Sequence, residues 1–259
     1  MTTLRSLLDL SGRTALVTDG SRGLGLAMAE ALGEFGARVI LTARKADELD
    51  QAVARLRDQG IDARAIAADL GKPGEPARLV EEIAGAGGRI DILVNNAGTS
   101  WGSPAEDMPL DGWNKLMAVN LTGPFLMAQA AARAFMIPAG WGRIVNIASV
   151  EGLLGHHPRM TGTIAYNASK GGLINFTRAL AAEWAPLGIN VNALAPGYFP
   201  SKLTGYVLDK HGDDILGDTP RGKLGSDADL KGAVLLLASE AGAHITGQIL
   251  AIDGGASII

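Results

Sequence analysis

Short apolar runs alternate with longer amphipathic segments along the whole chain, and this alternation constrains the fold more than any other feature. The apolar runs are almost continuous, which suits parallel strands covered on both faces. Strands are predicted at residues 14–18, 38–43, 64–68, 90–94, 143–148, 189–194 and 248–252. Helices are predicted at residues 24–35, 46–59, 75–86, 110–136, 164–185 and 227–238. The alternation predicts an α/β protein with a parallel sheet of seven strands built from right-handed crossovers.

One domain is predicted over residues 1–259, because single α/β domains of this length are common. Stretches rich in glycine and proline at 72–76, 85–88 and 138–142 are short enough to be connections. Residues 198–225 show weaker periodicity and contain several glycines. We expect this segment to leave the sheet and to form a mobile lid over a substrate.

The composition excludes several classes of function. The formal net charge is −4 and the basic residues form no run, so no nucleic-acid partner is expected. The absence of cysteine excludes disulfides, thiolate metal sites and a cysteine nucleophile. No stretch approaches about 18 uninterrupted apolar residues, and the first ten residues are too polar for a signal peptide. The expectation is a cytoplasmic protein without a membrane partner.

A glycine-rich turn follows the first predicted strand, with the sequence Thr-Asp-Gly-Ser-Arg-Gly-Leu-Gly at residues 18–25. Glycine allows a sharp turn and a close approach of the backbone to a pyrophosphate, and the following helix N-terminus offers free N–H groups. Alternatively, the turn is only a tight connection. The predicted phosphate-binding residues are Gly20, Ser21, Arg22, Gly23, Leu24 and Gly25.

Arg44 ends the second predicted strand, where an acidic residue would favour NAD and an arginine suits the 2′-phosphate of NADP. Arg22 supplies a second positive charge, although both arginines can instead be ordinary surface residues. NADP(H) is therefore the preferred cofactor, with NAD(H) possible. Asp69 and Leu70 lie along the same sheet edge, where Asp69 either accepts a bond from the adenine amino group or caps a helix. Small residues that let a flat ring lie against the backbone follow the fourth strand, at Asn96, Ala97 and Gly98.

Tyr166 and Lys170 are four residues apart in a predicted helix and therefore share one face. A neighbouring ammonium lowers the pKa of a phenol, which fits the tyrosine for general acid–base work on a ketone or alcohol. The alternative is a core tyrosine beside a surface lysine. Ser149, after the fifth strand, can hold a substrate oxygen or cap a turn. Asn120 lies in an apolar helix, where its amide can bond main chain or hold a water.

Together these residues resemble the short-chain dehydrogenase/reductase family, over the whole chain. The resemblance rests on the turn at 18–25, Asn-Asn-Ala-Gly at 95–98, Asn120, Ser149, the Tyr166-x-x-x-Lys170 motif, Pro196-Gly197 and Asp253-Gly254-Gly255. It implies a Rossmann-type doubly wound domain and a homotetramer or homodimer. It also implies a catalytic tetrad of Asn120, Ser149, Tyr166 and Lys170. Lys170 would contact the nicotinamide ribose beside Tyr166, with Pro196, Gly197 and Ser201 near the nicotinamide.

The sequence departs from the family pattern in two places. Asp19 replaces the first glycine of the turn, where its carboxylate is expected to repel a phosphate unless it points away or pairs with Arg22. The segment between Ser149 and Tyr166 is longer than usual, and its extra residues are expected near the mouth of a substrate pocket. No metal is predicted at His156-His157, because adjacent side chains diverge and no ligand cluster supports them.

The predicted substrate residues are Ser149, His157, Arg159, Tyr166 and Tyr198. Arg159 suits a carboxylate or phosphate through a bidentate bond, unless its loop is merely solvated or a subunit contact.

The predicted function is an NADP(H)-preferring oxidoreductase that interconverts a ketone and a secondary alcohol, with Tyr166 as general acid and base. Residues 196–204 (PGYFPSKLT) are similar to gluconate 5-dehydrogenases, which implies a sugar acid such as gluconate. A 3-oxoacyl-carrier-protein reductase is the near alternative. A non-catalytic nucleotide-sensing protein is the alternative of a different class: Asp19 favours the sensor, and retention of all four tetrad residue types favours the enzyme.

Overall fold

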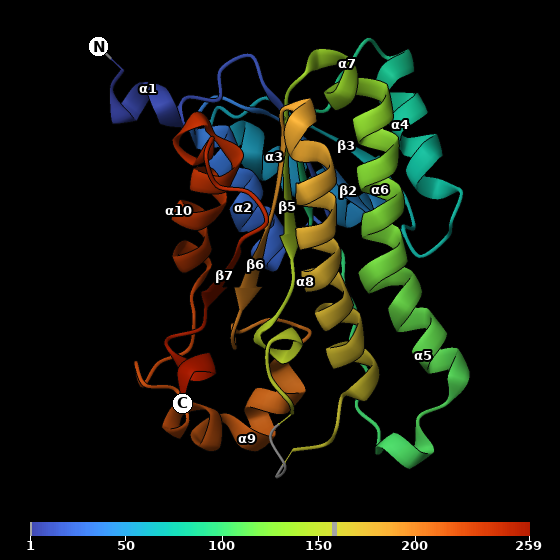
Figure 1. The fold of residues 1–259 in the computed structure, drawn as a ribbon, viewed down its shortest axis with the longest axis vertical. Coiled ribbons are helices and arrows are strands. Elements are labelled where there is room, and N and C mark those ends of the chain that lie inside the picture. Colours follow the sequence, from blue (N-terminus) through green and yellow to red (C-terminus); the bar gives the residue numbers. More distant parts are fainter. Residues whose placement is uncertain (1, 157–159) are drawn as a thin grey trace.

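The computed structural model describes residues 2–156 and 160–259 and contains one sheet of seven parallel strands (Figure 1). The strand order is β3-β2-β1-β4-β5-β6-β7. The predicted fold class is therefore confirmed. The strands are β1 Thr14–Thr18, β2 Arg38–Ala43, β3 Ala63–Ala67, β4 Ile92–Asn95, β5 Gly142–Ile147, β6 Ile189–Pro196 and β7 Ile249–Ile252.

The chain reverses its direction of travel across the sheet at β1. This strand pairs with β2 on one side, in the register Thr18↔Thr42, and with β4 on the other, in the register Val17↔Val94. In an open sheet of this kind, a crevice forms outside the carboxyl ends of the two strands at the reversal. We therefore expect a ligand site at the carboxyl ends of β1, β2 and β4.

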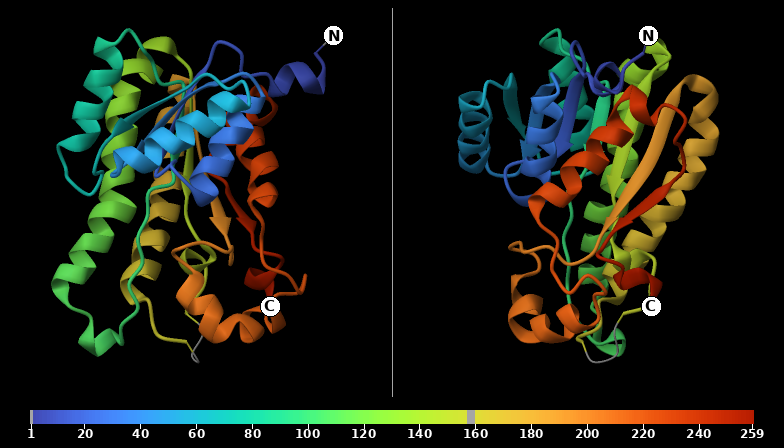
Figure 2. Two further views of the ribbon diagram at one scale, coloured as in Figure 1. Left: turned by 180° about the vertical axis from the view of Figure 1, so that it is seen from behind. Right: turned by 90° about the vertical axis from the view of Figure 1, so that its left-hand side faces the viewer.

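Helices cover both faces of the sheet (Figure 2). On one face, α2, α3 and α10 share an apolar core with β1 and β2, while α4, α6 and α8 pack on the other face. In α3 the buried positions are Leu49, Ala52, Val53 and Leu56, a stripe with helical spacing. The helices are α1 Leu4–Leu8, α2 Gly23–Glu34, α3 Ala46–Asp58, α4 Glu75–Gly85, α5 Leu110–Met117, α6 Gly123–Ala131, α7 Ile137–Ala139, α8 Ile164–Trp184, α9 Gly205–Gly217 and α10 Asp227–Ala238.

Two helical regions differ from the sequence prediction. The single helix expected at 110–136 consists of α5 and α6 joined by a π-helical turn at Ala118–Thr122, and a second π-helical turn follows at Ala132–Met136. The segment 198–225, for which no helix was predicted, contains α9 with non-helical backbone at His211. Figure 1 places α9 beyond the carboxyl ends of β5 and β6, on the side of the C-terminus. This location is compatible with a lid, and its mobility remains a prediction.

None of the helices in the described part of the chain is both long enough and apolar enough to cross a membrane.

Candidate active site

The glycine-rich turn between β1 and α2 is held by the Asn-Asn-Ala-Gly segment that follows β4. Thr18 Oγ1 accepts hydrogen bonds from the main-chain N–H groups of Asn96 at 2.9 Å and Ala97 at 2.8 Å. In return, Asn96 Nδ2 donates to the main-chain oxygens of Thr18 at 3.0 Å and Asp19 at 3.2 Å. The Asn96 amide therefore positions the turn, and the N–H groups of the first turn of α2 lie at the carboxyl edge of the sheet.

Asp19 adopts a left-handed backbone conformation, with φ of 48°, and is the only described residue other than glycine with positive φ. Aspartate tolerates this conformation better than most residues, but glycine adopts it without steric cost. Burial raises the pKa of the Asp19 carboxyl, while the positive charges of Arg22 and Arg44 lower it. The sequence therefore places an aspartate where the turn needs the conformation that glycine favours.

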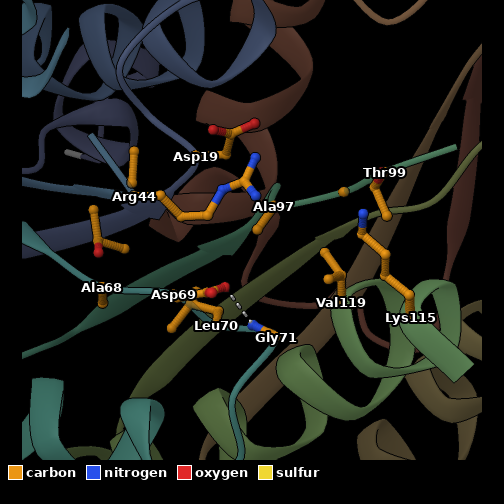
Figure 3. Close-up of a pocket in the computed structure, with 13 residues that line it drawn as sticks. Asp19, Arg44, Ala68, Asp69, Leu70, Gly71, Ala97, Thr99, Lys115 and Val119 are labelled. Carbon is orange, nitrogen blue, oxygen red and sulfur yellow. Dashed lines mark hydrogen bonds between the residues drawn. The ribbon is translucent and has the colours of Figure 1, made fainter.

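The side chain of Asp19 does not point away from the site. It lines a cavity, here called the Arg44 cavity, and the guanidinium of Arg44 extends toward it in Figure 3. Arg22 does not pair with Asp19: its Nη1 lies 2.9 Å from Glu48 Oε2, and Lys45 Nζ lies 2.9 Å from Glu48 Oε1. Glu48 thus pairs with two of the three cations near the turn, and of these three it is Arg44 that lines the cavity.

Five of the predicted cofactor residues line the Arg44 cavity (Figure 3). Asp69 is fixed there by its own loop, because its Oδ1 accepts a hydrogen bond from Gly71 N at 3.2 Å. Sequence reasoning missed Thr99, Lys115 and Val119, which face the same space from the segment after β4, from α5 and from the π-helical turn. The predicted residues that line the cavity are Arg44, Asp69, Leu70, Ala97 and Gly98.

Replacing Asp19 with glycine is expected to tighten NADP(H) binding roughly threefold to tenfold. The change removes a carboxylate beside the phosphate turn, and the loss of its repulsion contributes on the order of 1 kcal/mol to binding. Titration of both proteins with NADPH, followed by cofactor fluorescence, measures the dissociation constant. Asp19→Asn is the matched variant, because it removes the charge but keeps a side chain that tolerates positive φ. Unchanged or weaker affinity in both variants would contradict the repulsion.

The four predicted catalytic residues come from three parts of the fold and meet at the carboxyl edge of the sheet. Ser149 follows β5, Tyr166 and Lys170 lie on α8, and Asn120 lies in the π-helical turn. Lys170 Nζ donates to the main-chain oxygen of Ile147 at 2.7 Å, so the carboxyl end of β5 fixes the ammonium. A Cβ added to Gly98 would lie 3.6 Å from Lys170 Nζ and 3.7 Å from Asn120 Oδ1. The predicted cofactor segment and the catalytic residues are therefore neighbours.

Asn120 is fully buried. Its side-chain amide makes hydrogen bonds to the main chain, which was one of its two expected roles, and also to a side chain. Its Oδ1 accepts from Thr99 N at 2.9 Å, and its Nδ2 donates to Thr99 O at 2.9 Å and to Ser169 Oγ at 3.0 Å. The amide thus ties the segment after β4 to α8. Ser169 Oγ in turn donates to the main-chain oxygen of Tyr166 at 2.8 Å, so the tie reaches the catalytic part of the helix.

Burial dominates the protonation behaviour of Tyr166 and Lys170. It raises the pKa of Tyr166 to about 12, against an opposing effect from the hydrogen bond with Ser149. It lowers the pKa of Lys170 to about 8. The expected net lowering of the Tyr166 pKa is therefore wrong in this structure, because desolvation of the phenol outweighs the hydrogen bond with Ser149. A phenol that stays protonated at neutral pH is a proton donor, which suits reduction of a carbonyl.

Ser149 and Tyr166 open into a second cavity of about 460 Å³, here called the Tyr166 cavity. The segment between Ser149 and Tyr166 lines it through His156, Met160 and Thr161, so the expectation that this segment lies near the pocket is confirmed for these residues. The predicted substrate residues His157 and Arg159 lie outside the described residues.

The segment after β6 borders the same cavity. Gly197 lines it beside Pro196, the last residue of the strand, and Tyr198 lines it next in the chain. Ser201 Oγ pairs with Thr204 Oγ1 at 2.9 Å, so it braces the start of α9. The predicted nicotinamide-side residues therefore lie together at one end of β6.

Sequence reasoning missed Glu151, the acidic residue of the Tyr166 cavity. Its Oε1 accepts a hydrogen bond from Tyr198 OH at 3.2 Å, and its negative charge adds to the raised pKa of Tyr166. The signal available in the sequence was its place two residues after Ser149, at the carboxyl edge of the sheet. Trp101 and Leu203, which give one side of the cavity an apolar character, were also missed.

Among the described residues, no group of three or more histidine, aspartate or glutamate side chains is arranged to hold a metal ion.

Comparisons with known proteins agree with this geometry. A family model described as "Enoyl-(Acyl carrier protein) reductase" matches residues 20–257. The chain is 38% identical to the gluconate 5-dehydrogenase of Gluconobacter oxydans, over 97% of each chain. It is 39% identical to the rhamnolipids biosynthesis 3-oxoacyl-[acyl-carrier-protein] reductase of Pseudomonas aeruginosa, over 95% of this chain and 97% of that one. The structure of a gluconate 5-dehydrogenase from Burkholderia cenocepacia, in complex with NADP and tartrate, superposes with a TM-score of 0.94 at 37% identity, covering 99% and 100% of the two chains.

Proposed function

Because the chain belongs to the short-chain dehydrogenase/reductase family of NAD(P)-dependent oxidoreductases, we propose that it interconverts a ketone and a secondary alcohol with NADP(H), using Tyr166 as general acid and base. The observation that carries this proposal is that Ser149 and Tyr166 line the Tyr166 cavity while Lys170 lies close to Gly98, which lines the Arg44 cavity. A dinucleotide and a carbonyl compound have to meet at such a place for hydride transfer. The assembled tetrad counts against a non-catalytic sensor.

The residues of the turn fit the pyrophosphate of a dinucleotide. A Cβ added to Gly25 would meet Asp19 O and would lie 2.6 Å from Asn96 Nδ2, so the backbone is packed as closely as such a turn allows. The N-terminus of α2 supplies N–H groups and a positive dipole end for the anion. When bound, NADP(H) supplies or accepts the hydride at the substrate carbon.

The protein groups supply the proton and the orientation. In reduction, Ser149 Oγ holds the carbonyl oxygen and Tyr166 OH donates its proton to that oxygen, so that ketone, hydride and proton give the alcohol. In oxidation, Tyr166 takes the hydroxyl proton back. Lys170 is positioned by Ile147 O with its ammonium 5.7 Å from the centre of the Tyr166 ring, where its charge favours the phenolate that forms on proton donation.

The preference for NADP(H) is assigned to Arg44. Exchange of this residue for aspartate is expected to change the NADPH-to-NADH ratio of kcat/KM by about 10- to 100-fold in favour of NADH. The guanidinium loses a charge-assisted bond to the 2′-phosphate, and a carboxylate there accepts a bond from the free 2′-hydroxyl. Steady-state kinetics with both cofactors measure the ratio. The control is Arg5→Asp on α1, which makes the same change in net charge away from the cavity. Equal constants for both cofactors in the unaltered enzyme would contradict the assignment.

The proposed substrate is a hydroxylated ketone or its alcohol, with a sugar acid such as gluconate as the candidate that the sequence suggested. The polar part of the Tyr166 cavity, with Ser149, Glu151 and Thr163, supports a hydroxylated substrate. The apolar part, with Trp101, Leu203 and Val207, supports the second candidate, a 3-oxoacyl thioester. The test is a panel of gluconate, alditols, ketoses and a short 3-oxoacyl thioester, assayed with NADPH and NADP⁺. Turnover of the thioester alone would select the second candidate.

A homotetramer or homodimer is proposed as the assembly. Support comes from exposed apolar side chains of Phe125 on α6 and of Ile258 and Ile259 at the C-terminus. Light scattering of the purified protein gives the mass directly, and a monomer at micromolar concentration would exclude both assemblies.

A further inference from the structure

Glu151 is a largely buried carboxylate held inside the Tyr166 cavity. It comes two residues after Ser149, and its side chain is 16% exposed. Asn167 Nδ2 on α8 donates to Glu151 Oε2 at 2.7 Å and to its main-chain oxygen at 2.8 Å. Tyr198 OH donates to Oε1, and His156 Nδ1 lies 3.0 Å from Oε2. Three separate parts of the chain therefore fix this charge in place.

The carboxylate keeps capacity for a further donor. An ionised carboxyl group offers about four acceptor directions. Asn167, Tyr198 and His156 occupy three of them among the described residues. The carboxylate lines the same cavity as Ser149 and the Tyr166 hydroxyl, where the reacting oxygen has to lie. The fourth acceptor direction of Glu151 fits a hydroxyl on the substrate carbon next to the one that reacts.

The charges of the described residues that line the Tyr166 cavity disfavour an anionic substrate. Among the described residues that line it, Glu151 is the only aspartate or glutamate, and none is lysine or arginine. Within a partly buried cavity, a substrate carboxylate near Glu151 meets repulsion that water screens poorly. A hydroxyl in the same place donates a charge-assisted hydrogen bond instead. The two kinds of substrate thus differ in the sign of their interaction with this residue.

We propose that Glu151 is a specificity-determining residue, which accepts a hydrogen bond from a hydroxyl of an uncharged polyol or ketose and discriminates against the corresponding sugar acid. This inference rests on the proposed function, since it names the substrate class of the same site. Among the hydroxylated substrates proposed above, it favours uncharged polyols and ketoses over sugar acids such as gluconate.

D-glucitol and D-gluconate form a matched pair of probes, because they differ only in a hydroxymethyl group against a carboxylate at C1. The ratio of their kcat/KM values is measured with NADP⁺ at one pH for both compounds. The expected wild-type ratio favours D-glucitol. Glu151→Gln keeps the shape but removes the charge, and it is expected to lower the ratio at least tenfold, mainly through KM for the polyol.

Two controls separate specificity from structure. Glu82→Gln removes an exposed carboxylate on α4 that pairs with Arg78, and its ratio is expected to equal that of the wild type. Thermal unfolding and NADPH titration of Glu151→Gln show whether the variant is folded. For a variant that does not fold, the wild-type ratio decides alone, because the inference requires it to favour D-glucitol.

The outcomes distinguish the inference from the function on which it rests. A wild-type preference for D-gluconate, or an unchanged ratio in folded Glu151→Gln, overturns the inference while leaving the oxidoreductase proposal intact. Absence of NADP(H)-dependent turnover with every compound of the wider panel contradicts the proposed function, and the inference with it.

Discussion

Tyr166→Phe is expected to lower kcat by about 10²- to 10⁴-fold, the usual contribution of general acid–base catalysis. The variant loses the phenolic proton, while the ring that fills the space between Ser149 and Lys170 remains. Because burial already keeps the pKa of Tyr166 at about 12, the wild-type hydroxyl carries its proton at neutral pH and is ready to donate it. NADPH affinity is expected to change little, since the aromatic ring itself is kept. Single-turnover kinetics and NADPH titration measure the two quantities separately.

The matched control for this variant is Tyr206→Phe. Tyr206 lies on α9 and also lines the Tyr166 cavity, but it is 71% exposed. Loss of its hydroxyl is expected to leave kcat within about twofold, which separates the loss of the Tyr166 proton from the loss of any phenol in the cavity. A Tyr166→Phe enzyme that retains more than about a tenth of the wild-type rate would remove Tyr166 from the acid–base role.

Gly25→Ala is expected to weaken NADPH binding by tenfold or more and to lower the free energy of unfolding by about 1–3 kcal/mol, the range for overpacked sites. The added Cβ would meet Asp19 O and would lie 2.6 Å from Asn96 Nδ2. Both atoms belong to the bonds that hold the turn against the segment after β4, so neither can move without disturbing the phosphate site. Denaturant unfolding and NADPH titration give the two values.

Gly232→Ala is the corresponding control for the glycine substitution. Gly232 lies in α10, and a Cβ added there meets no atom within 4 Å. Alanine has the higher helix propensity, so this variant is expected to gain up to about 1 kcal/mol of stability with unchanged NADPH affinity. If both substitutions change NADPH affinity and stability equally, the close packing at Gly25 is not the reason that this position requires glycine.

The strands could be predicted because their apolar runs are nearly continuous, and the differences have local causes. The fourth strand begins at Ile92, not at residue 90, although the main chain of Asp91 already bonds Thr14 O and Arg143 N on the two neighbouring strands. The π-helical turn around Asn120 leaves no mark in the periodicity, since the flanking apolar positions stay compatible with one helix. In α9, the break at His211 shortens each regular stretch to a length that periodicity cannot distinguish from a loop.

Parts of the candidate site could be predicted where two residues belong to one short motif. Parts whose interacting residues come from distant segments of the chain could not. Tyr166 and Lys170 are fixed by helical spacing alone. The Glu151 carboxylate is held by hydrogen bonds from Asn167 on α8 and from Tyr198 after β6, and only the fold brings these three residues together. The replacement of glycine by Asp19 was visible in the sequence, but its positive φ and its place in the Arg44 cavity were not.

The central claim is that hydride leaves a nicotinamide for a carbonyl carbon while Tyr166 supplies the proton. The most direct measurement is the mass of the alcohol formed from a ketone by the wild-type enzyme with NADPH deuterated at C4 on one face or on the other. The account predicts a gain of one deuterium at the carbinol carbon from one of the two cofactors, at a rate that falls at least a hundredfold in Tyr166→Phe. An alcohol without deuterium from either cofactor, or an equal rate in the variant, would contradict it.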